Sequence, residues 1–141
     1  MGSDAVYVDE SIAFDRFVSE RLLQGALMVQ ECRACTGTWH PPSGRCPLCG
    51  SANWEWREAS VQGELYSFTI VHHAPSASFK EHVPYIIGWV ELEGSARVLG
   101  FIVGVSDAIR VGQRVWLATP DETFPYVVPT FCLSREEAGT K

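Results

Sequence analysis

Four of the five cysteines form two pairs, and each pair has two residues between its cysteines. The pairs are Cys32 with Cys35 and Cys46 with Cys49. This spacing lets one tight turn direct both sulfurs at a single ion, and two such knuckles provide the tetrahedral set of thiolates that suits zinc. Because four thiolates close the coordination sphere, no position remains for a catalytic water. The spacing therefore predicts a structural zinc site.

Other roles for the cysteines stay open at the level of the sequence. A rubredoxin site would bind iron with the same thiolates, and two disulfides or four buried free thiols would bind no metal. We interpret His40, between the pairs, as a loop residue because four cysteines already suffice as ligands. We expect Gly37 and Gly50 to supply the positive φ that each knuckle turn needs. Cys132 stands alone in an apolar segment, which favours a buried structural thiol.

The chain shows no self-contained catalytic constellation. It lacks P-loop, G-x-G-x-x-G, G-x-S-x-G and H-E-x-x-H motifs, and no two carboxylates stand out as an acid–base dyad. His72 and His73 are adjacent at the expected end of a strand, where they would point to opposite faces and could not share one metal. In one interpretation, one of the two histidines faces solvent and the other is packed. In the alternative, one of them, together with His82, lines a ligand path or reaches a partner's site.

One helix and a series of strands must position these residues. Phe14, Val18 and Leu22 recur every fourth residue, which predicts a helix over residues 11–24, capped by Ser11 and ended by Gly25. Short strands are predicted on either side of the cysteines, at 27–31 and 54–57. Five more strands are predicted after Ser60, at 63–72, 85–92, 97–105, 113–118 and 126–133. The last five predict a small antiparallel barrel or sandwich.

Aromatic side chains are abundant near both predicted modules. Alternation places Tyr66, Phe68 and Ile70 on one strand face, and the aromatic residues of the strands are interpreted as core, with Trp89, Phe101 and Trp116 among them. A ribbon is too small to bury its own indoles, so we expect some of these to face the barrel or a partner: Trp39, Trp54 and Trp56. The apolar face of the helix must likewise pack on the body of the protein or on a partner.

Composition limits the classes of partner. The net charge is −6, from 11 basic and 17 acidic residues, which disfavours binding to a phosphate backbone. No apolar run reaches the roughly 20 residues that span a bilayer, and no signal peptide is recognised. We therefore expect a cytoplasmic protein in a reducing compartment, where cysteines are more often metal ligands than disulfides.

The order of helix, ribbon and barrel, together with several motifs, resembles a known family. The motifs are Cys-Arg-Ala-Cys at 32–35, Trp-His-Pro-Pro at 39–42, Cys-Pro-Leu-Cys-Gly at 46–50, Gly-Glu-Leu-Tyr-Ser-Phe-Thr at 63–69, Pro-Tyr at 84–85 and Val-Gly at 111–112. Over residues 14–133 the chain is similar to the zinc-ribbon/OB-fold proteins once grouped as domain of unknown function 35. The resemblance implies a mainly β chain with four parts: a tail and docking helix at 1–25, a rubredoxin-like zinc ribbon at 26–57, a five-stranded antiparallel OB-fold barrel at 58–134 and a polar tail at 135–141.

The resemblance also implies a function. Such proteins are non-catalytic accessory subunits of thiolase-like enzymes in acyltransferase, condensing or aldolase complexes, so a hetero-oligomer away from membranes is expected. The barrel would bind an acyl-CoA or acyl intermediate and guide it toward the partner's catalytic cysteine. Candidate contacts with ligand or partner are Tyr66, Phe68, His72, His73, Phe79, Tyr85 and Arg97, with Lys80 and Arg110 as further basic groups for CoA phosphates. The competing hypothesis is an OB-fold module for single-stranded nucleic acid, for which the aromatic platforms are present but the charge is unfavourable.

Overall fold

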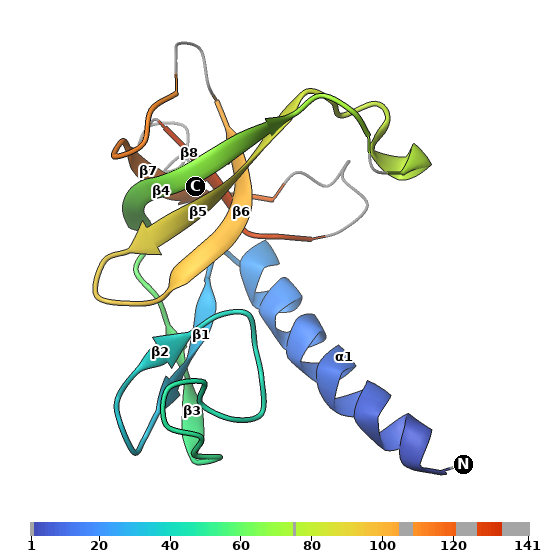
Figure 1. Ribbon diagram of the computed structural model, residues 1–141, viewed down its shortest axis with the longest axis vertical. Helices are drawn as coiled ribbons and strands as arrows, with labels where there is room; N and C mark the ends of the chain where they lie inside the picture. The colour runs from blue at the N-terminus through green and yellow to red at the C-terminus, as the bar shows by residue number, and fades with distance from the viewer. Residues whose placement is uncertain (1, 75, 105–108, 121–126, 134–141) are drawn as a thin grey trace.

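A helix leads into a small three-stranded sheet, and a closed five-stranded barrel follows (Figure 1). The computed structural model describes residues 2–74, 76–104, 109–120 and 127–133, with side chains from residue 13 onward. The chain is therefore mainly β with one N-terminal helix, as predicted. The small sheet lies below the barrel in Figure 1, and the helix runs beside it.

The helix α1 spans Gly2–Leu23, so the prediction that it begins at Ser11 was wrong. Residues 3–10 contain no Gly or Pro to stop the helix, and the lack of apolar period there concealed its first turns. Its end is as predicted. Gly25 has a φ of 92°, and the N–H groups of Gly25 and Ala26 donate to the carbonyls of Leu22 and Arg21 at 3.0 and 2.9 Å. This pattern of two bonds around a left-handed glycine closes a helix C-terminus.

The apolar face of α1 packs on the protein itself. Val18 and Leu22 are buried in the main core, whereas Phe14 and Phe17 contact the indole of Trp56 with ring centroids 5.9 and 4.8 Å apart. Phe14 also lies 5.6 Å from Trp54. The second half of the helix is thus a structural part of the body and covers the tryptophans of the ribbon.

The ribbon sheet consists of β1 (Met28–Cys32), β2 (Thr38–Trp39) and β3 (Trp54–Glu58), in the order β2-β1-β3 with antiparallel pairing. Gly50 has a φ of 81°, as predicted, but Thr36 rather than Gly37 adopts the positive φ of the first knuckle, at 65°. A Cβ at Gly37 would meet the end of the Leu48 side chain, which is 71% exposed and can move aside. The predicted role of Gly37 is corrected accordingly.

The barrel consists of β4 (Gln62–Val71), β5 (Tyr85–Leu92), β6 (Arg97–Val103), β7 (Arg114–Ala118) and β8 (Thr130–Cys132), closed in the order β4-β5-β6-β8-β7. The expectation of a wholly antiparallel barrel was wrong, because β6 and β8 run parallel. Strand directions cannot alternate all the way around a closed ring with an odd number of strands. One parallel pair is therefore unavoidable, and the chain places it where its last strand closes the ring.

The centre of the barrel is filled by side chains that are at most 1% exposed: Leu65, Val90, Val98, Val115 and Phe131. Cys132 is also buried, as predicted. The last strand, Thr130–Cys132, is shorter than the expected 126–133. Three predicted parts lie outside the described residues: Tyr126, residue 105 of the expected third barrel strand, and the tail at 135–141.

A bulge in β4 overturns the prediction that Tyr66, Phe68 and Ile70 share a face. The register passes from Leu65 opposite Val90 directly to Ser67 opposite Trp89, so Tyr66 has no partner across the ladder. The extra residue resets the alternation of the strand. Phe68 consequently packs against the core, while Tyr66 is 47% exposed on the outside.

Candidate metal centre and the adjoining cleft

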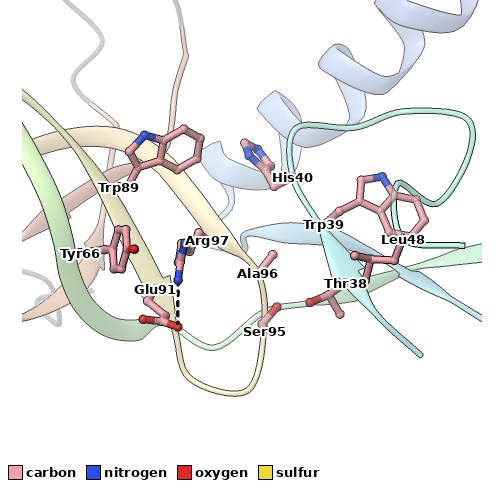
Figure 2. Close-up of a pocket in the computed structure, with 10 residues that line it drawn as sticks. All are labelled: Thr38, Trp39, His40, Leu48, Tyr66, Trp89, Glu91, Ser95, Ala96 and Arg97. Carbon is pink, nitrogen blue, oxygen red and sulfur yellow. Dashed lines mark ion pairs between the residues drawn. The ribbon is translucent and has the colours of Figure 1, made fainter. Parts of the chain in front are cut away.

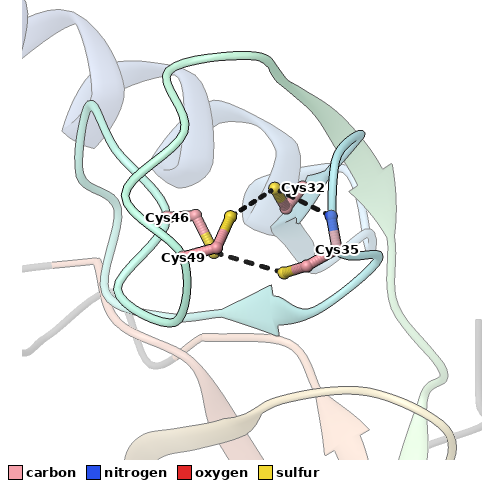
Figure 3. Close-up of side chains that lie close together, drawn as sticks. All are labelled: Cys32, Cys35, Cys46 and Cys49. Carbon is pink, nitrogen blue, oxygen red and sulfur yellow. Dashed lines mark hydrogen bonds between the residues drawn. The ribbon is translucent and has the colours of Figure 1, made fainter.

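The four cysteines of the two knuckles meet at one point of the ribbon (Figure 3). All four sulfurs lie within 4.8 Å of one another, with Cys32 and Cys49 separated by 3.6 Å and Cys35 and Cys46 by 3.7 Å. A tetrahedral ion with Zn–S bonds of about 2.3 Å holds its sulfurs about 3.8 Å apart. The cysteines are not joined as disulfides, and their geometry fits a closed tetrathiolate zinc site.

Backbone N–H groups surround the sulfurs. Those of Ala34 and Cys35 lie 3.3 and 3.4 Å from Cys32 Sγ, and that of Leu48 lies 3.3 Å from Cys46 Sγ. The N–H of Cys35 in particular lowers the pKa of Cys32 to about 7, against the opposing effect of burial. The N–H groups therefore stabilise thiolates at the places where a cation would bind.

The thiols differ strongly in acidity without a cation. The N–H of Ser51 favours the thiolate of Cys49, but the adjacent sulfur of Cys32 and burial outweigh it and raise the pKa of Cys49 to about 12. Four neighbouring thiols cannot all ionise by themselves because the negative charges repel. A divalent cation removes this conflict, so deprotonation of the set and metal binding are coupled.

Gln30, in the middle of β1, holds the loop between the two cysteine pairs. Its side chain is completely buried, its Nε2 donates to the carbonyl of Ser43 at 2.7 Å, and its Oε1 accepts from the N–H of Ser43 at 2.8 Å. Trp54 Nε1 donates to the carbonyl of Gly44 at 3.1 Å. Sequence reasoning missed Gln30, although an uncharged polar residue directly after the apolar run 26–29 was a signal for a buried hydrogen bond.

A cleft of about 590 Å³ lies between the ribbon and the barrel (Figure 2). Figure 2 shows barrel side chains on one wall, ribbon side chains on the opposite wall, His40 at one end and the β5–β6 turn at the other. The lining residues are Thr38, Trp39, His40, Leu48, Tyr66, Trp89, Glu91, Ser95, Ala96 and Arg97. The cleft thus exists only because the two modules lie together.

The barrel wall of the cleft is aromatic and carries one cation. The guanidinium carbon of Arg97 lies 3.7 Å from the ring centroid of Tyr66, a cation–π contact, and Arg97 Nη2 lies 4.0 Å from Glu91 Oε2. Trp89 is 38% exposed, so its interpretation as core was wrong. It pairs with Ser67 just after the bulge and therefore points outward.

The ribbon wall is apolar and is built on the metal centre. Trp39 packs with Cys32 and Cys46 and is 6% exposed, whereas Leu48, inside the second knuckle, is 71% exposed. His40 follows β2 in a loop, as expected, and burial lowers its pKa to about 4, so its ring is neutral near pH 7. The shape of this wall therefore depends on the fold of the cysteine knuckles.

The other predicted contact residues do not reach the cleft. Phe79 and Tyr85 stack with centroids 5.6 Å apart, and Tyr85 meets Phe101 edge-on at 5.5 Å, in a separate aromatic group at the start of β5. His72 and His73 are exposed beyond the end of β4 at Val71, so the argument from strand alternation does not apply to them. Lys80 and Arg110 are exposed as well. Of the seven candidates, Tyr66 and Arg97 come together here.

A four-cysteine ribbon joined to a closed five-stranded barrel defines the zinc-ribbon/OB-fold class of protein. Comparison with family models agrees: residues 19–55 match the ChsH2 rubredoxin-like zinc ribbon domain, and residues 56–119 match the ChsH2 C-terminal OB-fold domain. A DUF35 domain-containing scaffold protein of Methanocaldococcus jannaschii is 31% identical over 102 residues, which cover 71% of this chain and 70% of the relative. The chain therefore belongs to the DUF35 family, and the expected structural zinc ribbon is confirmed.

Two further relatives are larger proteins or parts of assemblies. A probable enoyl-CoA hydratase alpha subunit of Thermomonospora curvata is 38% identical over 118 residues, 80% of this chain, but the chain spans only 36% of that relative's length. The solved Ltp2-ChsH2(DUF35) aldolase contains a chain that is 36% identical, with a TM-score of 0.70 and 84% and 93% of the two chains covered.

A DUF35 protein of unknown function from Sulfolobus solfataricus shares the fold, with a TM-score of 0.59, 16% identity and coverage of 84% of both chains. In the described part of this chain, no helix has the length and apolar character needed to cross a membrane.

Proposed function

We propose that the chain is a non-catalytic accessory subunit that docks on a thiolase-like enzyme and binds an acyl-CoA or acyl intermediate for it, in the cytoplasm. The observation that carries the proposal is the likeness to a DUF35 chain in a solved aldolase assembly, at 36% identity and over 93% of that chain. The hydratase relative points to the same substrate class, because its name refers to an enoyl-CoA. The enzyme partner would supply the catalytic cysteine.

The chemistry of the described residues supports an accessory role. The single cluster of metal-binding groups among them is the cysteine set, whose four thiolates leave no open coordination position. His72 and His73 are exposed beyond the end of β4 and lie outside the cleft. The chain offers surfaces and a cleft, which are the means of a subunit that holds and orients a substrate.

The parts of the chain that would dock on the enzyme are those that do not pack into the chain's own core. We propose that residues 1–25 dock on the enzyme through the first half of α1, which extends away from the barrel in Figure 1, because Val18 and Leu22 of the second half are occupied by the core. Residues 26–57 and 58–134 then form the zinc ribbon and the OB-fold unit. The exposed His72 and His73, together with Phe79 and Tyr85, give the barrel a second contact region for the partner or the acyl chain, and Phe68 is left out of it because it packs against the core.

Coexpression tests this proposal. The full chain is produced together with a candidate thiolase-like enzyme, and the mixture is analysed by size-exclusion chromatography with light scattering and by calorimetry with acetyl-CoA. We expect one stable hetero-oligomer that binds acetyl-CoA. A monodisperse free chain with no affinity for either molecule would overturn the proposal, and salt-dependent binding of an oligonucleotide in a shift assay would favour the nucleic-acid hypothesis instead.

A further inference from the structure

Buried polar atoms without partners are concentrated around the cleft. Among the described residues, four buried side-chain nitrogen or oxygen atoms have no hydrogen-bond partner, and three of these belong to residues that line the cleft: Trp39 Nε1, His40 Nδ1 and Ser95 Oγ. The fourth, Arg21 Nε, lies in α1. Buried polar atoms in folded proteins are almost always paired. Three such atoms belong to residues that line one cleft, so the cleft is the place where the described structure leaves hydrogen bonding incomplete.

The unpaired atoms and their neighbours define the polar character of the surroundings of the cleft. Trp39 Nε1 can only donate, the Ser95 hydroxyl can donate and accept, and the neutral His40 ring has one donor and one acceptor nitrogen. Glu91, on the barrel wall, adds carboxylate acceptors. A ligand that satisfies these groups has several acceptors and at least one donor arranged on a rigid frame.

The walls of the cleft indicate the body of that ligand. Trp89 is 38% and Tyr66 is 47% exposed, so both rings offer aromatic surface on which a flat ring can stack. The side chain of Arg97 is 49% exposed, and its nearest acidic group, Glu91, is 4.0 Å away, so its guanidinium retains donors for an anion. The volume of about 590 Å³ falls within the usual range for small-ligand sites, about 300–1,000 Å³.

From these observations we propose that the cleft binds the adenine nucleotide portion of the acyl-CoA, an assignment that rests on the proposed function. The adenine ring stacks on the barrel wall beside Trp89, which is 38% exposed. The exocyclic amino group of adenine is the matching donor for Glu91, since this base carries ring acceptors and one amino donor. Phosphate oxygens of the nucleotide bind Arg97, whose planar donor group suits phosphate.

The test is an NMR titration of the full zinc-loaded chain, labelled with ¹⁵N, in which the indole N–H signals are followed. The probes are AMP, the pantetheine arm alone and intact CoA. We expect AMP to shift the signal of Trp89 by stacking and that of Trp39 by the proximity of the adenine ring, because both residues line the cleft. The signal of Trp116 should remain in place, because its Nε1 already donates to Gln62 Oε1 at 3.1 Å outside the cleft. Trp116 therefore serves as the internal control.

Two arginine variants form a matched pair. The Arg97 and Arg114 side chains are both 49% exposed and both face a carboxylate, but only Arg97 lines the cleft. Arg97→Gln should weaken AMP binding about tenfold, as expected for the loss of a charged hydrogen bond, and Arg114→Gln should leave it unchanged. Trp89→Ala, at a position that is 38% exposed on the outside of the barrel, should abolish the shift of Trp39.

The outcomes separate this assignment from the proposed function. If AMP moves neither indole signal at millimolar concentration while CoA still binds, the assignment to the cleft is wrong and the accessory role stands. If pantetheine rather than AMP moves both signals, the cleft binds the arm and the nucleotide assignment is overturned. If AMP binds as expected but acyl-CoA does not support complex formation with the enzyme, the proposed function fails while the cleft remains a nucleotide site.

Discussion

Arg57 of β3 joins the zinc ribbon to the barrel through the carbonyl of Gly94. Its Nη2 donates to that carbonyl at 3.0 Å in the β5–β6 turn, while its Nη1 donates to Glu31 Oε2 of β1 at 3.0 Å. The same turn contributes Ser95 and Ala96 to the cleft. One guanidinium therefore ties the ribbon to the turn at one end of the cleft.

Arg57→Ala should loosen this junction and reduce the free energy of unfolding by about 1–2 kcal/mol, because two charge-assisted bonds at a partly exposed position are lost. Urea unfolding measures the loss, and amide hydrogen exchange around Gly94 shows whether the turn is released. Arg33→Ala is the control, since the Arg33–Glu55 pair of 2.9 Å is about half exposed and lies within the ribbon. Equal effects of the two substitutions would contradict a special role for Arg57.

Cys46→Ser should remove the metal and unfold the ribbon, because Cys46 is both a ligand and part of the small core with Cys32 and Trp39. Elemental analysis should find about one zinc per chain in the parent and little in the variant, and tryptophan fluorescence should report the exposure of Trp39. Cys132→Ala, at a buried cysteine of the barrel, should retain the zinc. Full metal content in Cys46→Ser, or a red protein with stoichiometric iron, would show the assignment to be wrong.

Gln30→Met should destabilise the zinc-loaded chain by about 2–3 kcal/mol, because the backbone N–H and carbonyl of Ser43 lose their partners in a buried position. Chemical unfolding at constant zinc concentration is the measurement. Ser43→Ala keeps both backbone bonds to Gln30 and should be nearly neutral. A Gln30→Met variant as stable as Ser43→Ala would mean that the loop is held by other contacts.

His40 should make the folded chain sensitive to acid. Its pKa is lowered by burial from 6.5 to about 4, so the unfolded chain binds the proton more readily, and stability falls as the pH drops from about 6.5 toward 4. His40→Leu cannot bind this proton. The other titratable groups nearby are the same in both proteins: Glu91 and Arg97, which line the cleft together with His40, and the cysteines. The stability of the parent relative to His40→Leu should therefore decline over this pH range, and a constant difference in unfolding free energy would refute the effect.

The parts of the fold that depend on neighbours in the chain were predictable. The C-x-x-C spacing fixes both knuckles within a few residues, so the position of the metal centre follows from the order of the amino acids. The end of α1 at Gly25 and the positive φ of Gly50 follow from local backbone preferences in the same way.

Errors arose where distant segments decide the outcome. The position of Tyr66 depends on a bulge that is defined against β5, and the parallel pairing of β6 with β8 depends on how the ring closes. Alternation in a single strand contains neither fact, which is why the sequence predicts Phe68 on the same face as Tyr66. The core prediction for Trp89 rests on its aromatic character alone, and the alternation of β5 puts this residue outside.

The sequence by itself determined the zinc ribbon, the barrel and the family, because cysteine spacing and strand patterns are local properties of the chain. Only the tertiary structure decided where the cleft lies. The cleft forms between Trp39 of the ribbon and Trp89 of the barrel, residues that are far apart in the chain and meet through packing of the two modules and the Arg57 bond. Hydrogen bonds left unmade by Trp39, His40 and Ser95 can be recognised only when the surroundings of each atom are known.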